Sequence, residues 1–263
     1  MMPDDLLSRI FAQQWTLFVF VTVLLLACSE AGYRMGLRIF VAKDAGRKAQ
    51  IGGVQGAVLG LLGLLLGFTF AMAVSHYDGR RGLVLNEANA IGTTYLRASL
   101  LPDSHVAPVK DLLHRYTGAR LNYQRLADDP DKLAEGLRVC AAIQAELWTH
   151  ATAAAKEAPT AMTSTFIVAL NETIDVDAER LAAARARIPA GVWLLLVIVA
   201  GCGCFTTSYG AGAEGERTVL GGVFLPFLFV VVIVLIFDLS HSRQGMITVS
   251  QQPLVDLLQS MEP

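Results

Sequence analysis

The stretch IGGVQGAVLGLLGLLLGFTFAMAVSHY, residues 51–77, decides the fold, because it contains no Asp, Glu, Lys or Arg and is almost entirely apolar. A helix needs roughly 20 mostly apolar residues to cross the hydrocarbon core of a bilayer. Three further segments meet this requirement, at about 15–36, 190–210 and 218–239. Hydrophobic residues make up 54% of the chain and charged residues 17%. The sequence therefore predicts a polytopic membrane protein with four transmembrane helices.

A polar insert, residues 78–189, separates the spans into two pairs and is too long to be a hairpin loop. Its apolar residues recur at helical spacing, and alternating strand patterns are missing. Pro, Asp, Ser and Thr cluster at 101–105, 127–131 and 157–160, where we expect one helix to end and the next to begin. The prediction is an all-α chain with a 2+2 layout of spans and a bundle of four helices between them, two of which continue transmembrane helices.

Four segments follow from these boundaries. We expect a tail with the first two spans at 1–77, a helical soluble domain at 78–189, the last two spans at 190–239 and a C-terminal tail at 240–263. The tail carries one apolar stripe at i, i+3, i+4 and i+7, formed by Leu254, Leu257, Leu258 and Met261. This short amphipathic helix is expected to dock on its own domain, on a neighbouring subunit or on the bilayer surface.

Charge and motifs exclude several function classes. The formal net charge is −2, with acidic and basic residues mixed throughout, so there is no basic footprint for nucleic acid. The chain has no G-x-S-x-G or P-loop motif, and its five histidines lack H-E-x-x-H spacing. These absences predict a protein that is not an enzyme and needs no cofactor.

One acidic group needs a separate interpretation. Glu172, Asp175 and Glu179 occur at i, i+3 and i+7, a spacing that could present oxygen ligands to a divalent ion. The more common outcome is a solvated or salt-bridged face, and Arg180 and Arg185 lie within reach. We therefore predict no metal site.

Glycines form a stripe about 100° wide on the second span, and Ala71 continues it. The stripe consists of Gly52, Gly53, Gly56, Gly60, Gly63 and Gly67. Small residues at such spacing allow close packing of transmembrane helices, the role expected for Gly52, Gly53, Gly56 and Gly63. Alternatively, copies of this helix surround an axis, with a vestibule at Gly60, Gly67 and Ala71 that narrows at Leu64 and Phe68. Hydrophobic constrictions of this kind gate conduction by dewetting.

Polar residues after this span are candidates for a pore mouth. His76 lies at the membrane boundary, where its titration near neutral pH could alter conduction, or where it is a plain interfacial residue beside Tyr77. Asn86, Glu87 and Asn89 follow. They either fix helix register and oligomeric state or line the axis below the constriction.

Three stretches of the sequence carry resemblances to known families. LGFTFAMAVSHYDGRRGLVLNEANAIG, residues 66–92, resembles the end of the second transmembrane helix of bestrophin anion channels. EANAIGTTYLR (87–97), DLSHSRQGMITVSQQPL (238–254) and the 2+2 layout resemble a bacterial membrane family of unknown function labelled bestrophin-like. This second resemblance covers nearly the full length.

The resemblance to bestrophins implies a homopentamer whose second helices line a pore with a hydrophobic neck. Phe68 would occupy the last neck position and Leu64 the one before, whereas the next turn back carries Gly60. The calcium clasp of animal bestrophins needs acidic residues after the fourth span. Only Asp238 stands there, so calcium gating is not carried over.

The orientation in the membrane has conflicting signals. The loop 37–50 carries Arg38, Lys43, Arg47 and Lys48, which predicts a cytoplasmic loop and a periplasmic soluble domain. Arg80 and Arg81, at the domain end of the second span, favour the opposite orientation, and the resemblance implies a cytosolic domain.

The sequence as a whole predicts a homo-oligomeric channel of the bacterial inner membrane, in contact with lipid and with small ions. Anion conduction is implied only by the resemblance. The alternative is a non-conducting membrane scaffold or sensor whose helical domain binds a partner.

Overall fold

The computed structural model describes residues 3–38, 45–125, 130–186, 188–217, 219–240 and 247–261. Every regular element within these residues is a helix, and none of them forms a strand. The chain is therefore an all-α protein, as predicted.

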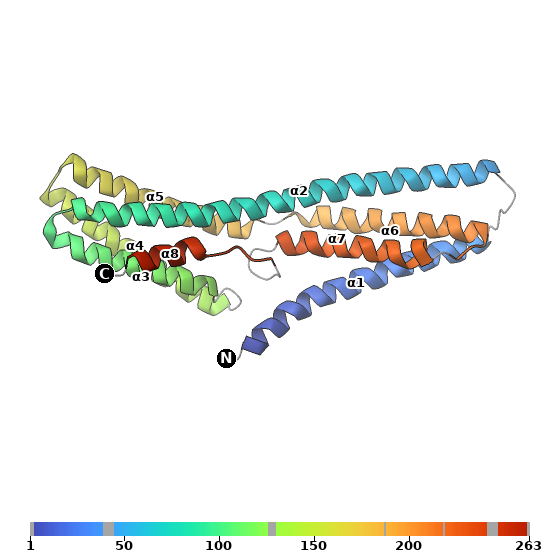
Figure 1. Ribbon diagram of the computed structural model, residues 1–263, viewed down its shortest axis with the longest axis horizontal. Helices are drawn as coiled ribbons and strands as arrows, with labels where there is room; N and C mark the ends of the chain where they lie inside the picture. The colour runs from blue at the N-terminus through green and yellow to red at the C-terminus, as the bar shows by residue number, and fades with distance from the viewer. Residues whose placement is uncertain are drawn as a thin grey trace. The chain divides into compact units, whose positions relative to one another are not determined.

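The elements follow one another along the chain as drawn in Figure 1: α1 (Pro3–Arg38), α2 (Ala45–Arg97), the short 3-10 helix η1 (Ala98–Leu100), α3 (Asp103–Arg125), α4 (Pro130–Glu157), α5 (Ala161–Arg185), α6 (Ala190–Glu214), the π-helical turn η2 (Leu220–Phe224), α7 (Leu225–Ser240) and α8 (Gln252–Ser260).

Four helical stretches among the described residues are long and apolar enough to cross a membrane. They are Trp15–Arg38, Gly46–Leu100, Ala161–Glu214 and Leu220–Ser240. These are the two predicted pairs. Pro189 stands immediately before α6, where its fixed φ and missing N–H suit the start of a helix. Residues 39–44 of the basic loop used to orient the chain, Lys43 among them, lie outside the described residues.

The chain divides into two compact units, and the division falls within α2, between His76 and Tyr77. The first, which we call the membrane unit, contains α1, the first part of α2, α6, η2 and α7. The second, the helical unit, contains the rest of α2, η1, α3, α4, α5 and α8. Each has its own hydrophobic core.

The membrane unit is built around the contact between α1 and α6. An added Cβ at Gly32 or Gly36 of α1 would overlap the carbonyl oxygen of Phe205 or Tyr209 on α6. An added Cβ at Gly212 of α6 would overlap the carbonyl oxygen of Tyr33. The two backbones therefore touch, which is the close packing that small residues permit between transmembrane helices. The sequence analysis located this packing on α2 and missed it here.

Side-chain hydroxyls add polar contacts inside the membrane unit. The Ser29 Oγ on α1 lies 2.6 Å from the Ser208 Oγ on α6 and donates a 3.0 Å hydrogen bond to the carbonyl oxygen of Gly222. Gly222 belongs to η2, a π-helical turn, where carbonyl groups depart from the α-helical ladder. The serine thus satisfies a backbone acceptor where lipid offers no donor.

The helical unit closes around large apolar side chains from every one of its longer helices. Fully buried members are Ile91, Leu113, Tyr116, Leu147, Phe166, Leu170 and Leu254. Helix α5 begins where the sequence predicts a break, because the Thr160 Oγ1 accepts a hydrogen bond from the Thr163 N–H at 3.2 Å. Leu254 brings α8 into this core, so the C-terminal helix docks on its own domain.

We expect Gly212→Ala to lower the free energy of unfolding by about 1–3 kcal/mol, because the new methyl group would push α6 away from the α1 backbone. The matched control is Gly191→Ala, on the same helix, where an added Cβ meets no atom within 4 Å. Thermal unfolding of the purified variants in detergent measures the difference. Equal stability of the two variants would contradict this packing.

Candidate functional site

The apolar part of α2 has one packed face and one uncovered face. Leu62 is fully buried in the core of the membrane unit, together with side chains of α1, α6 and α7. Gly203 of α6 makes room for this packing, because Leu59 and Leu62 of α2 lie within 4 Å of its Cβ position. Ala73 is also fully buried, so the packed face extends along much of the span.

The opposite face carries the predicted pore residues. Phe68 is 65% exposed and Leu64 55% exposed, and Gly60, Gly67 and Ala71 are exposed as well. At 100° per residue these five positions fall within about 100° of one another. The structure therefore places them together on a continuous strip that no other part of the described chain covers.

The predicted packing glycines lie on the uncovered side too. No atom lies within 4 Å of the Cβ positions of Gly52, Gly53, Gly56 and Gly63. Inside the described chain these four glycines contact no other helix, so their packing role stays a prediction. A packing role for them can only involve another molecule.

Two polar residues of α2 lie close to this strip but turn inward. Thr69 is buried, and its Oγ1 donates a 2.7 Å hydrogen bond to the carbonyl oxygen of Leu65. His76 is half-buried, and its Nδ1 has no hydrogen-bond partner among the described residues. Neither side chain lies on the uncovered strip.

The three polar residues expected at a pore mouth do not share one environment. Asn86 and Asn89 are exposed, whereas Glu87 is 0% exposed in the interior of the helical unit. Successive helical residues point about 100° apart, so neighbours on one turn can have opposite surroundings. Glu87 cannot line an open pathway, which corrects its assignment to the mouth.

Glu87 belongs to a buried ionic network that the sequence analysis missed. Its Oε1 accepts a 2.5 Å bond from the Nε of Arg120, and its Oε2 pairs with Arg180. Arg120 also bonds the Oδ1 of Asp177 at 2.5 Å. Two carboxylates and two guanidinium groups make the network neutral, as burial requires. The one signal of this network in the sequence is the i, i+3 spacing of Asp177 and Arg180 on α5. That spacing is typical of an exposed pair on a helix surface and does not indicate burial.

Neutral polar groups complete this network. The Nε2 of Gln144 donates to the hydroxyl oxygen of Tyr116 at 3.0 Å and to the Oδ2 of Asp177 at 2.9 Å. Burial raises the pKa of Tyr116, so the phenol stays protonated. Burial also raises the pKa of the Cys140 thiol, which makes it a poor nucleophile. These buried ionisable groups therefore have a structural role.

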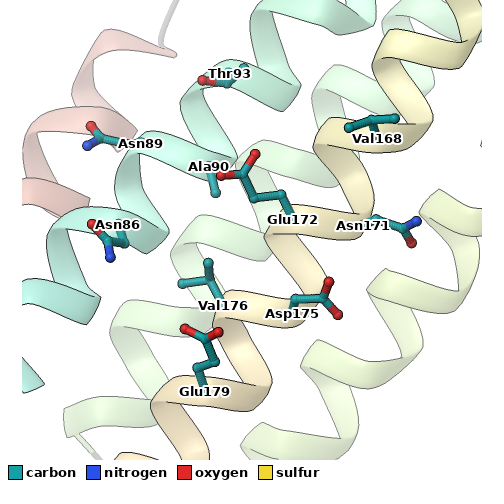
Figure 2. Close-up of a pocket in the computed structure, with 10 residues that line it drawn as sticks. All are labelled: Asn86, Asn89, Ala90, Thr93, Val168, Asn171, Glu172, Asp175, Val176 and Glu179. Atoms are coloured by element: carbon teal, nitrogen blue, oxygen red, sulfur yellow. The ribbon is translucent and has the colours of Figure 1, made fainter.

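The acidic residues of α5 line an open pocket between α5 and α2, with a volume of 740 Å³ (Figure 2). Its polar lining consists of Asn86, Asn89, Thr93, Asn171, Glu172, Asp175 and Glu179. Figure 2 shows that the three carboxylates point in different directions and do not converge on one point. Among the described residues, no group of three or more His, Cys, Asp or Glu side chains is arranged to hold a metal ion.

We expect Glu87→Gln to lower the free energy of unfolding by about 3–5 kcal/mol, because it leaves buried guanidinium charge uncompensated. The matched control is Glu146→Gln on α4, where the glutamate is exposed and the change should have little effect. Chemical denaturation followed by circular dichroism measures both. Similar stability of the two variants would contradict the buried network.

The comparisons with known proteins agree with this architecture. A family model described as the bestrophin-like domain matches residues 20–254. No curated protein matches the chain. Two crystal structures of point variants of a bacterial bestrophin homologue from Klebsiella pneumoniae have a similar fold. One superposes with a TM-score of 0.60 at 15% identity over 92% of this chain and 98% of that chain. The other has a TM-score of 0.62 at 14% identity over 97% of this chain and 95% of that chain.

At such low identity the two crystal structures establish the fold alone, whereas the family model covers most of the sequence. The chain belongs to the bestrophin-like family.

Proposed function

We propose that this protein is a homo-oligomeric ion channel of the bacterial inner membrane, in which the uncovered face of α2 lines the pore. The observation that carries the proposal is the exposure of Gly60, Leu64, Gly67, Phe68 and Ala71 on one strip of a helix whose opposite face is packed. One helix per chain cannot enclose an axis, so the pore requires several copies. The resemblance of residues 66–92 to bestrophins supports a pentamer.

Leu64 and Phe68 form the constriction in this proposal. They are the two large side chains among the five residues of the strip, whose other members are glycine or alanine. A ring of Phe68 side chains would exclude water from a narrow pore, and a change in its diameter would open or close the ion path by wetting. Gly60 leaves a wider vestibule one turn before Leu64.

The four glycines predicted to pack helices would lie where neighbouring copies of α2 approach one another. Gly52, Gly53, Gly56 and Gly63 have open space at their Cβ positions, so a second α2 can approach their backbone closely. Van der Waals contact of this kind supplies association energy where lipid supplies no hydrophobic driving force.

The mouth of the pore is assigned to Asn86 and Asn89. Both asparagines are exposed, and their amides can donate to an anion or offer an oxygen to a cation. His76 is left out because it is half-buried and does not lie on the uncovered strip. Glu87 is left out because it is buried and paired.

Ion selectivity has two opposing indications. The resemblance of residues 66–92 to bestrophin anion channels supports anion conduction. The pocket beside Asn86 and Asn89 carries Glu172, Asp175 and Glu179, and carboxylates near a pathway favour cations. We assign a preference for anions as part of the proposal, and the flux experiment below measures it.

A second candidate function is a non-conducting scaffold or sensor. The open polar pocket of the helical unit favours it, because a pocket of 740 Å³ is large enough to receive part of a partner. Oligomeric state discriminates the two functions. A monomer or dimer in detergent, measured by light scattering, would exclude the axial pore and leave the scaffold.

We expect Phe68→Ala to raise ion flux several-fold in liposomes that contain the purified protein, because a methyl group no longer blocks water at the constriction. Flux is measured under a chloride gradient and then under a potassium gradient. The reversal potential of a planar bilayer recording gives the ion preference, and a value near the potassium potential would overturn the anion assignment.

The matched control is Phe70→Ala, the same substitution on the same helix about 160° around from Phe68. Phe70 is exposed but lies off the strip, so its removal should leave flux unchanged. Equal effects of the two substitutions, or no flux from either protein despite verified incorporation, would contradict the proposed pore.

The periplasmic side is our proposal for the helical unit, based on the basic residues between the first two spans. The test uses a chain in which the four native cysteines are replaced by serine and the exposed Ala142 of α4 is changed to cysteine. A membrane-impermeant maleimide should label this cysteine in intact spheroplasts. Labelling only after lysis would place the helical unit in the cytosol, in line with Arg80 and Arg81.

A further inference from the structure

Two histidines that the proposed channel does not use meet inside the helical unit. His105, in the first turn of α3, and His150, near the end of α4, have their Nδ1 atoms 3.0 Å apart. The ring planes are 77° apart, with centroids 5.3 Å from one another. Both nitrogens therefore face the same small volume, from two helices that are distant in sequence.

The far side of one ring is held by a carboxylate. The Nε2 of His105 lies 3.3 Å from the Oε2 of Glu157 on α4, and the same Oε2 accepts a 3.4 Å hydrogen bond from the Oγ of Ser104. A proton on Nε2 satisfies Glu157 and leaves the Nδ1 of His105 with a lone pair directed at His150. Metal-binding histidines commonly have this arrangement, in which a carboxylate fixes the tautomer and raises the basicity of the ligand.

We propose that His105 and His150 bind one divalent transition-metal ion through their Nδ1 atoms, with Glu157 as the outer partner of His105. Zinc binds imidazole nitrogen at about 2.0–2.1 Å in a tetrahedral shell, which sets two ligand nitrogens about 3.3 Å apart. The observed separation of 3.0 Å is within a few tenths of an ångström of this value. Imidazole suits Zn²⁺, Cu²⁺ and Ni²⁺, whereas Ca²⁺ and Mg²⁺ prefer oxygen ligands.

The site has two protein ligands, since no set of three or more candidate side chains surrounds a metal position in the described part of the chain. Water completes the coordination shell. His105 is only partly buried, so solvent reaches it. A bound ion would join the start of α3 to the end of α4 and stabilise the helical unit by its binding free energy.

The first experiment is isothermal titration of Zn²⁺ into the full-length protein in detergent at pH 7.5, with an affinity tag that contains no histidine. We expect one ion per chain for the wild type, and loss of this binding in His105→Gln and in His150→Gln. Glu157→Gln should weaken the affinity about 10–100-fold without abolishing binding. Glutamine keeps hydrogen-bonding capacity, and circular dichroism and gel filtration verify that each variant is folded.

The matched control is His114→Gln, a histidine on the same helix that is not part of the pair. It should bind Zn²⁺ as the wild type does. Equal binding by all three histidine variants, or no binding by the wild type, would overturn the proposal and leave the pair as a simple imidazole hydrogen bond.

A second measurement counts the ligands directly. Cu²⁺ added at one equivalent should give pulsed electron paramagnetic resonance spectra with modulation from the remote nitrogens of two imidazoles. His150→Gln should reduce the signal to that of one imidazole or fewer. Spectra that show a single imidazole in the wild type would exclude a site shared by His105 and His150.

Discussion

The structure depends on the asymmetry of α2. One side of its apolar span is fixed by Leu62 and Ala73 against the rest of the membrane unit, while the side with Leu64 and Phe68 is left uncovered. Since the packed face orients the helix, it also determines which residues are presented outward. In water such an exposed apolar strip would favour aggregation, but in a membrane it can face lipid, a second copy or a pore. The function proposed here follows from what covers this one face.

The polar continuation of α2 obeys a different constraint, because buried charges must be paired. Glu87 supplies one of two carboxylates that neutralise Arg120 and Arg180, and Asp177 supplies the other. Removing any one of the four would leave an uncompensated charge in a dry interior, at a cost of several kcal/mol. The same network includes Gln144, which donates hydrogen bonds to Tyr116 and Asp177. Charge pairing fixes the orientation of this part of α2, as apolar packing does in the membrane unit.

Sequence reasoning was sufficient for the spans, because hydrophobic length alone identifies them, and for the all-α class, because helical periodicity persists through the insert. It placed Leu64 and Phe68 on one strip, since position on a helix follows from spacing. It failed for Glu87, because the ionic partners of this residue come from helices distant in sequence. The spacing of residues along one helix does not show which side chains are buried by tertiary packing. Sequence reasoning also missed the contact of Gly32 and Gly36 with the helix that carries Gly212, although Gly32 and Gly36 have the G-x-x-x-G spacing of closely packed transmembrane helices. His105 and His150 are a further pair that only the fold brings together.

The two sets of glycines indicate what the exposed strip is for. On α1 and α6, a neighbouring backbone fills the space that a side chain at Gly32, Gly36 or Gly212 would take. On α2 the space beside Gly52, Gly56, Gly60 and Gly67 is open, although a helix gains nothing in lipid from leaving its backbone bare and loses stability relative to alanine. A run of glycines that faced only acyl chains would therefore lower the stability of the helix without forming a compensating contact. The glycines are explained if a second α2 approaches this face closely, or if the face lines a pore wide enough for hydrated ions. An assembly of several copies around Phe68 would provide both.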